Sequence, residues 1–144
     1  MIRPAKPTDA PAMAEVLSRW IDATDWMPRM HTHAGDLGFC ERLVTRQEVW
    51  VADTAKGFGF LARQGDEIDA LYLSPALRRQ GWGSALLQAV KTDRERLRLW
   101  TFQANTGAIA FYQAQDFHIS DLTDGAGNDE KLPDARMIWE RNRP

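Results

Sequence analysis

The stretch from Asp66 to Gln88 constrains the fold of this chain most, because it combines a strand, a glycine-containing turn and a helix. Residues 67–73 suit a buried, pleated strand, and Pro75 ends that strand because proline has no N–H to donate. From Ser84 onward the apolar residues recur with helical spacing. This succession predicts an architecture in which helices pack on a sheet.

The turn between this strand and helix reads Arg78-Arg79-Gln80-Gly81-Trp82-Gly83-Ser84. Gly81 and Gly83 have no Cβ, so a ligand can approach the backbone closely. The start of a helix carries unpaired N–H groups and a partial positive charge, and two arginines add full charge beside it. The turn therefore predicts a phosphate-binding site. The alternative is a turn that serves only to pack a helix on the sheet.

The rest of the chain is predicted to alternate between strands and helices. An edge strand is expected at residues 1–5, since Pro4 fits only an edge. Further strands are expected at 48–52, 57–62, 96–102, 117–120 and 136–140, and helices at 10–21, 36–46, 84–94 and 107–115. This order predicts a mixed α/β fold, an α+β sandwich, with a parallel strand pair across the central helix.

Length, charge and cysteine content limit the classes of function. The 144 residues fit one domain, residues 1–144, with a core of its own. The net charge of −2 argues against a nucleic-acid-binding face. Cys40 is the only cysteine, which excludes an internal disulfide, and its helical spacing favours a buried thiol. Neither a signal peptide nor a membrane span is expected, so a cytoplasmic location is predicted.

A second motif, Asn105-Thr106-x-Ala108-Ile109-x-Phe111-Tyr112-x-x-x-x-Phe117, follows the strand at 96–102. Together with the glycine turn, which looks like an Arg/Gln-x-x-Gly-x-Gly/Ala pyrophosphate turn, it resembles the GNAT superfamily of N-acetyltransferases. One departure is Asp116, because the family often has glycine before the aromatic residue of the next strand. The resemblance implies a largely antiparallel sheet with one splayed parallel pair, flanked by helices.

The resemblance also implies acetyl-CoA as co-substrate. The main chain of the strand before the glycine turn would bind the pantetheine arm as a neighbouring strand would. The pyrophosphate would lie on the N–H groups from Arg79 to Ser84, with the arginine side chains within reach. The implied cofactor-binding residues are Leu71, Tyr72, Leu73, Arg78, Arg79, Gln80, Gly81, Trp82, Gly83, Ser84, Asn105, Ala108, Phe111 and Tyr112.

The chemistry of acetyl transfer needs a base, an oxyanion contact and an acid. An amine must lose its proton before it attacks, and a lysine-like amine has a pKa of about 10.4. Glu67 stands where some family members have a catalytic glutamate, and Asp69 has the same strand parity. The N–H of Leu73 could stabilise the oxyanion, and Tyr112 is the family's proton donor to the leaving thiolate.

The residues and the resemblance leave several alternatives open. The resemblance implies an enzyme whose acceptor is a small-molecule or peptide amine, and the alternative is a non-catalytic sensor of acyl-CoA. A nucleotide-binding protein is disfavoured, since Gly-Lys-Ser/Thr is missing and Leu86 stands at the third glycine position. His31 and His33 could serve as a base or contact the acceptor, but no metal site is predicted. The last strand, if exposed, could pair across a homodimer.

Overall fold

The structure, a computed structural model, describes residues 2–142 and contains one seven-stranded sheet in the order β1-β2-β3-β4-β5-β7-β6. All neighbouring strands are antiparallel except β4 and β5, which are parallel. The strands are β1 (Ile2–Pro4), β2 (Glu48–Thr54), β3 (Gly57–Gln64), β4 (Glu67–Leu73), β5 (Arg96–Phe102), β6 (His118–Thr123) and β7 (Asp134–Glu140). The expected mixed sheet with one parallel pair is therefore confirmed.

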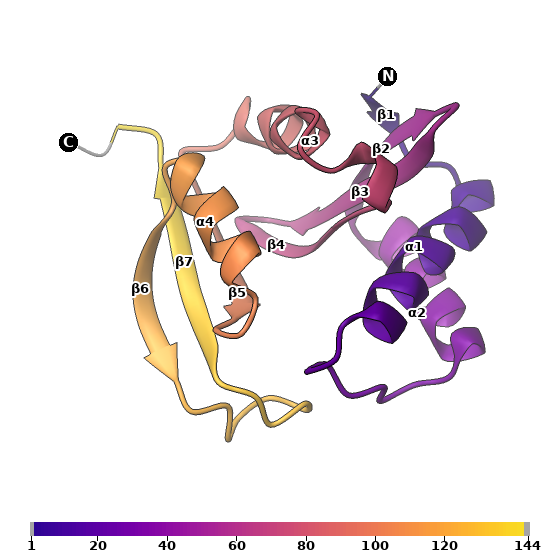
Figure 1. Cartoon of the computed structure of the whole chain (residues 1–144). Helices are drawn as coiled ribbons and strands as arrows, with labels where there is room; N and C mark the ends of the chain where they lie inside the picture. The colour runs from indigo at the N-terminus through magenta and orange to yellow at the C-terminus, as the bar shows by residue number, and fades with distance from the viewer. Residues whose placement is uncertain (1, 143–144) are drawn as a thin grey trace.

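Helices cover both faces of the sheet (Figure 1). They are α1 (Ala10–Ala23), α2 (His33–Arg46), α3 (Trp82–Lys91) and α4 (Thr106–Ala114), with short 3-10 turns at Pro7–Asp9 and Pro75–Leu77. On one face, α1 and α2 bury a cluster that includes Met13, Leu17, Cys40, Leu43, Val51 and Phe60. On the other face, α3 and α4 bury Leu61, Leu86, Leu87, Leu97, Leu99, Tyr112 and Met137. None of the helices in the described residues is long and apolar enough to cross a bilayer.

Most predicted elements are present, with shifts at their ends. The ranges expected for β4 and β5 agree with the structure, whereas α2 begins at His33 rather than at residue 36. The earlier start follows from Thr32, whose hydroxyl oxygen accepts a hydrogen bond from the Gly35 N–H at 3.0 Å and caps the helix. Asp116 adopts a φ of 70°, a left-handed conformation that explains why glycine is common at this place in similar proteins. Met1, the first residue of the expected edge strand, lies outside the described residues.

The last strand, β7, does not meet the condition of exposure on which pairing across a homodimer depends. β7 is paired along its whole length with β5 on one side and over residues 134–138 with β6 on the other. It is an interior strand because the β6–β7 hairpin folds back and places β6 at the edge of the sheet. A homodimer stays a prediction, but Met137 and Trp139 offer no surface for it because both are buried.

Candidate active site

The parallel strands β4 and β5 are joined at one end only. Their single register pair is Glu67 with Arg98, beside a hydrogen bond of 2.8 Å from the Arg98 N–H to the Asp66 carbonyl. By contrast, β5 pairs with β7 over all seven of its residues. Beyond Glu67 the two strands diverge, and no register pair joins Leu71–Leu73 to β5 (Figure 1). The carboxyl end of β4 thus leaves main-chain groups facing β5 without a partner in that strand.

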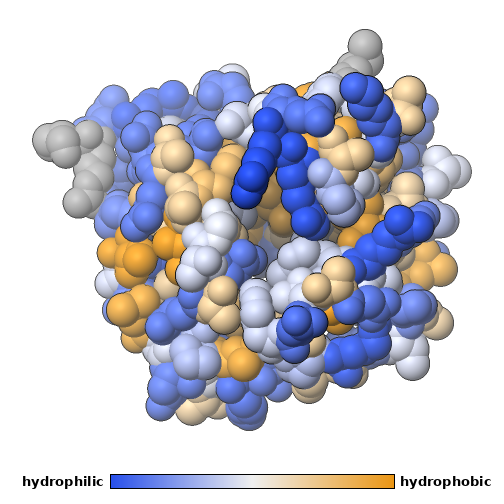
Figure 2. Space-filling model, viewed as in Figure 1, coloured by the Kyte–Doolittle hydropathy of each residue, from blue (hydrophilic) through white to orange (hydrophobic). Residues whose placement is uncertain are grey.

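The glycine turn lies at the start of α3 and next to the carboxyl end of β4, since a Cβ added to Gly83 would lie 3.7 Å from Cδ1 of Leu73. Gly81 is the N-cap residue with a φ of 85°, a conformation that disfavours any side chain with a Cβ. No side chain caps α3, so the N–H groups of its first turn are available to an anion. Arg78 and Arg79 are exposed beside it. Figure 2 shows that this face is hollowed near its centre, with strongly hydrophilic side chains at the rim.

The close contact between α3 and α4 explains the second glycine of the turn. A Cβ added to Gly83 would lie 3.0 Å from Cζ of Phe111. The Gln115 side chain donates a hydrogen bond of 2.7 Å to the Ser84 hydroxyl, which joins the same two helices. Asn105 caps α4, since its side-chain oxygen accepts from the Ala108 N–H at 3.1 Å. These residues therefore have structural roles, and their contacts with a cofactor stay predictions.

Tyr112 lies on α4 and is buried against Phe111 and Phe117, with ring centroids 5.3 and 5.4 Å away. Burial, together with the neighbouring Tyr72, raises the pKa of the Tyr112 hydroxyl above its ordinary value. The hydroxyl is therefore protonated throughout the neutral pH range. A protonated phenol is the form that a proton donor requires.

The two predicted acids of β4 have different partners. Glu67 accepts a bidentate pair of bonds from Arg136, both 2.9 Å, and a third from Nε of Arg98 at 3.1 Å. Asp69 accepts from the Gln47 amide at 2.7 Å. Asp69 is the extra residue of a β-bulge, since Ala62 pairs with Ala70 and Arg63 with Ile68.

Aromatic rings bridge the opening on the α1–α2 side. Trp20 contacts Tyr72 at a centroid distance of 5.3 Å and Trp26 at 5.9 Å, and Trp26 in turn contacts Phe102 at 5.8 Å. The row therefore runs from β4 through α1 and the following loop to β5. Trp26 thus forms part of an apolar wall beside the opening.

Arg29 holds the loop that carries Trp26. Its guanidinium donates to Asp22 at 2.7 Å and to the buried Asp36 at 2.8 Å. It also donates to the backbone carbonyls of His31 and Ser18, at 2.9 and 3.1 Å. Since these partners lie in α1, in α2 and in the loop itself, one side chain fixes the loop to both helices.

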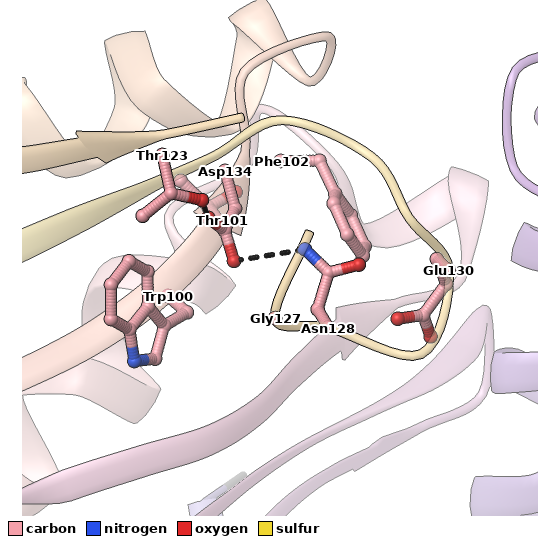
Figure 3. A pocket seen from close by; sticks show the side chains of 8 residues that line it. All are labelled: Trp100, Thr101, Phe102, Thr123, Gly127, Asn128, Glu130 and Asp134. Carbon is pink, nitrogen blue, oxygen red and sulfur yellow. Dashed lines mark hydrogen bonds between the residues drawn. The ribbon is translucent and has the colours of Figure 1, made fainter. Parts of the chain in front are cut away.

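A pocket of about 550 Å³ opens beside the carboxyl end of β5 (Figure 3). It is lined by Trp100, Thr101, Phe102, Thr123, Gly127, Asn128, Glu130 and Asp134. Neither Glu130 nor Trp100 was predicted from the sequence as a site residue. The only feature of the sequence that indicated Trp100 is that it alternates with Leu97 and Leu99 along β5 and therefore faces away from the side on which they are buried.

The histidines of the α1–α2 loop and of α2 are placed at the surface. His33 lies 3.1 Å from a carboxylate oxygen of Asp22, and the His31 backbone bonds to Arg29. Among residues 2–142 no group of three or more His, Cys, Asp and Glu side chains is arranged to hold a metal ion. Cys40 is fully buried, as predicted, and burial raises the pKa of its thiol to about 12.

Comparison with known proteins identifies the family. Residues 45–119 match the acetyltransferase (GNAT) domain, and the peptidyl-lysine N-acetyltransferase YiaC of Escherichia coli (strain K12) is 35% identical, covering 96% of both chains. The chain therefore belongs to the GNAT acetyltransferase family. It is an acyltransferase, an N-acetyltransferase with acetyl-CoA as its co-substrate.

Solved structures share the fold at low sequence identity. The solution structure of apo-form YjaB from Escherichia coli has a TM-score of 0.78 at 19% identity, with 96% of each chain covered. The structure of yncA from Salmonella typhimurium with its cofactor acetyl-CoA has a TM-score of 0.72, also at 19% identity, and covers 100% of this chain and 95% of that one. The splayed pair and the glycine turn described above fit the elongated, phosphate-bearing acetyl-CoA.

Proposed function

We propose that the protein transfers the acetyl group of acetyl-CoA to the side-chain amine of a lysine in a peptide or protein, by direct attack in a ternary complex. The observation that carries the proposal is the opening at the carboxyl ends of β4 and β5, which lies between the glycine turn and the aromatic-lined pocket. The similarity to a peptidyl-lysine N-acetyltransferase supports lysine as the acceptor.

In this proposal the two sides of the opening bind the two substrates. The pantetheine arm lies along Leu71–Leu73 and bonds to main-chain groups that β5 leaves unpaired. The pyrophosphate lies on the N–H groups of the first turn of α3, where no side chain competes for them. The lysine enters from the opposite side, through the pocket at Trp100 and Phe102.

The reaction forms one C–N bond and breaks one C–S bond. The neutral amine attacks the thioester carbonyl carbon, and the N–H of Leu73 stabilises the oxyanion. Collapse of the intermediate expels the coenzyme A thiolate, which takes a proton from the Tyr112 hydroxyl. A tyrosine held in its protonated form by burial supports this role. The products are the acetylated amine and coenzyme A.

The amine proton needs an acceptor, and Glu67 and Asp69 stay the predictions for this role. Both carboxylates already accept hydrogen bonds from protein groups. A base with such partners acts through a water molecule or after one partner has moved. The variants Glu67→Gln and Asp69→Asn separate the two candidates. Replacing the carboxylate that acts as the base should lower kcat and leave the affinity for acetyl-CoA unchanged.

The experiment that tests the proposal combines calorimetry with turnover. Acetyl-CoA and coenzyme A should bind, whereas ATP and NAD should not. Nα-acetyl-lysine methylamide and a lysine-containing peptide should then each give amine-dependent thiol release and an acetylated product by mass spectrometry. A peptide whose lysine is dimethylated is the control. Acetyl-CoA binding without lysine-dependent thiol release would contradict the proposed acceptor.

A further inference from the structure

The aromatic-lined pocket contains two carboxylates, and the fold uses only one of them. Asp134 accepts hydrogen bonds from Thr123 and, at 3.2 Å, from the Asn128 amide, so its oxygens hold the β6–β7 loop together. Glu130 receives no side-chain hydrogen bond or ion pair from any of residues 2–142 and yet lines the same pocket. A carboxylate without a structural partner, placed at a pocket wall, is available to a ligand.

The position of Glu130 relates the pocket to the opening between the central strands. Burial raises the pKa of Tyr72 to about 12, and the charge of Glu130 adds to the increase. Glu130 therefore lies close enough to β4 for its charge to act on the Tyr72 hydroxyl. Figure 3 shows the Glu130 side chain on the loop that encloses the pocket, and the residue is half-buried rather than exposed.

Arg136, the cation of β7 beside the pocket, does not compete for the Glu130 carboxylate. The Arg136 guanidinium stacks on the Trp100 ring at 5.0 Å, but it is already paired with Glu67 at both of its terminal nitrogens. No lysine or arginine is among the residues that line the pocket. The pocket therefore presents apolar rings and an uncompensated negative charge, a combination that fits an apolar stem ending in a cation.

We propose that Glu130 binds the ammonium group of the incoming acceptor and thereby selects cationic amines carried on an apolar stem, with Trp100 and Phe102 contacting the stem. This inference rests on the proposed function and names the residue that determines acceptor specificity. Glu130 acts in binding, before the amine loses its proton. The residue therefore governs the acceptor KM more than kcat.

The test uses Glu130→Gln, with Asp129→Asn as the matched control. Both changes remove one negative charge from the same loop, but Asp129 is exposed and does not line the pocket. With Nα-acetyl-lysine methylamide as acceptor, Glu130→Gln should raise KM about tenfold, the effect of losing one charge-assisted hydrogen bond. Glu130→Lys should raise KM further, whereas Asp129→Asn should stay within about twofold of wild type.

Two further measurements separate this inference from the proposed function. Nα-acetyl-norleucine methylamide, which has the stem without the charge, should inhibit wild type and Glu130→Gln equally. Equilibrium binding of the lysine probe to the coenzyme A complex needs no turnover, and it should weaken in Glu130→Gln even if transfer is absent. Equal KM and equal binding for Glu130→Gln and Asp129→Asn would overturn the inference, as would failure of the lysine probe to bind wild type.

Discussion

The two ends of the β4–β5 pair differ in what joins the strands. At the amino end, Glu67 pairs with Arg98 and Arg136, and Asp66 pairs with Arg94 and Arg96. At the carboxyl end no ladder hydrogen bond joins the strands, and the space between them is bordered by the aromatic row and by α3. One end is thus closed by charge pairs, and the other is left open to a ligand.

This difference shows how a sheet can be stable although one of its strand pairs is open at one end. Main-chain groups that are buried without a partner are costly, so an opening inside a sheet persists only when other contacts hold its sides. Here the charge pairs hold the amino ends, while Trp20 and Trp26 connect the two sides of the carboxyl end. The open end is accordingly where we place both substrates.

The largest effect is expected from Tyr112→Phe at the open end. Removal of the proton donor should lower kcat by about 10²–10⁴-fold, while acetyl-CoA affinity is unchanged. Tyr72→Phe removes the same atom from the other side of the sheet and should have a much smaller effect on kcat. A large loss in Tyr72→Phe with none in Tyr112→Phe would assign the donor to Tyr72 instead. Assays of thiol release measure kcat, and calorimetry measures the affinity for acetyl-CoA.

Arg29→Met should have the next largest effect, because it frees the loop that carries Trp26. Loss of the bonds to Asp22, Asp36 and two carbonyls should move Trp26 away from Phe102 and raise the acceptor KM about tenfold. Tryptophan fluorescence should report the movement. Arg19→Met is the control, since among residues 2–142 Arg19 pairs only with the exposed Glu15 on α1. An unchanged acceptor KM in Arg29→Met would show that the loop does not shape the site.

Gly81→Ala should have a moderate effect on the cofactor side. At a φ of 85° an alanine costs about 1 kcal/mol, so both the melting temperature and acetyl-CoA affinity should fall. Gly107→Ala is the matched control, because Gly107 lies in the first turn of α4 with open space around its Cβ position. That change should be neutral or slightly stabilising. Equal acetyl-CoA affinity in both variants would remove Gly81 from the proposed phosphate site.

The smallest effect is expected at the closed end, from Asp66→Asn. The hydrogen bond from Arg96 lowers the pKa of Asp66, so the ionised form stabilises the native state above the carboxyl's unfolded pKa. This stability is lost as the pH falls through the lower, native-state pKa. At pH 7 the free energy of unfolding of the variant should therefore be lower than that of wild type by less than about 1 kcal/mol. The difference should vanish in strong acid, and a difference that persisted there would contradict the charge-pair account.

Much of this arrangement could be predicted from the sequence, because it depends on local chemistry. The boundaries of β4 and β5 follow from Pro75 and from the alternation of Leu97 and Leu99, and the glycine turn follows from its own motif. The bulge at Asp69 could not be predicted, since it arises from pairing with Ala62 and Arg63 on another strand. The interior position of β7 likewise depends on a hairpin that folds back over a long polar loop.

The functional side chains divide in the same way. Tyr112 belongs to a short sequence motif, so it could be predicted from the sequence. Glu130 could not, because nothing in the polar loop distinguishes it from Asp129 until the fold places one at the pocket and the other in solvent. Arg29 was missed because its four partners come from two helices and a loop.

Amide hydrogen exchange, measured with and without acetyl-CoA, tests the central claim most directly, because it reports on both ends of the β4–β5 pair at once. We expect acetyl-CoA to slow exchange in segments 71–73 and 79–84, where main-chain groups would bind the pantetheine arm and the pyrophosphate. Segments 66–68 and 96–98, already closed by hydrogen bonds and charge pairs, should change little. Protection that is absent from 71–73, or equal at both ends, would contradict the assignment of the open end as the acetyl-CoA site.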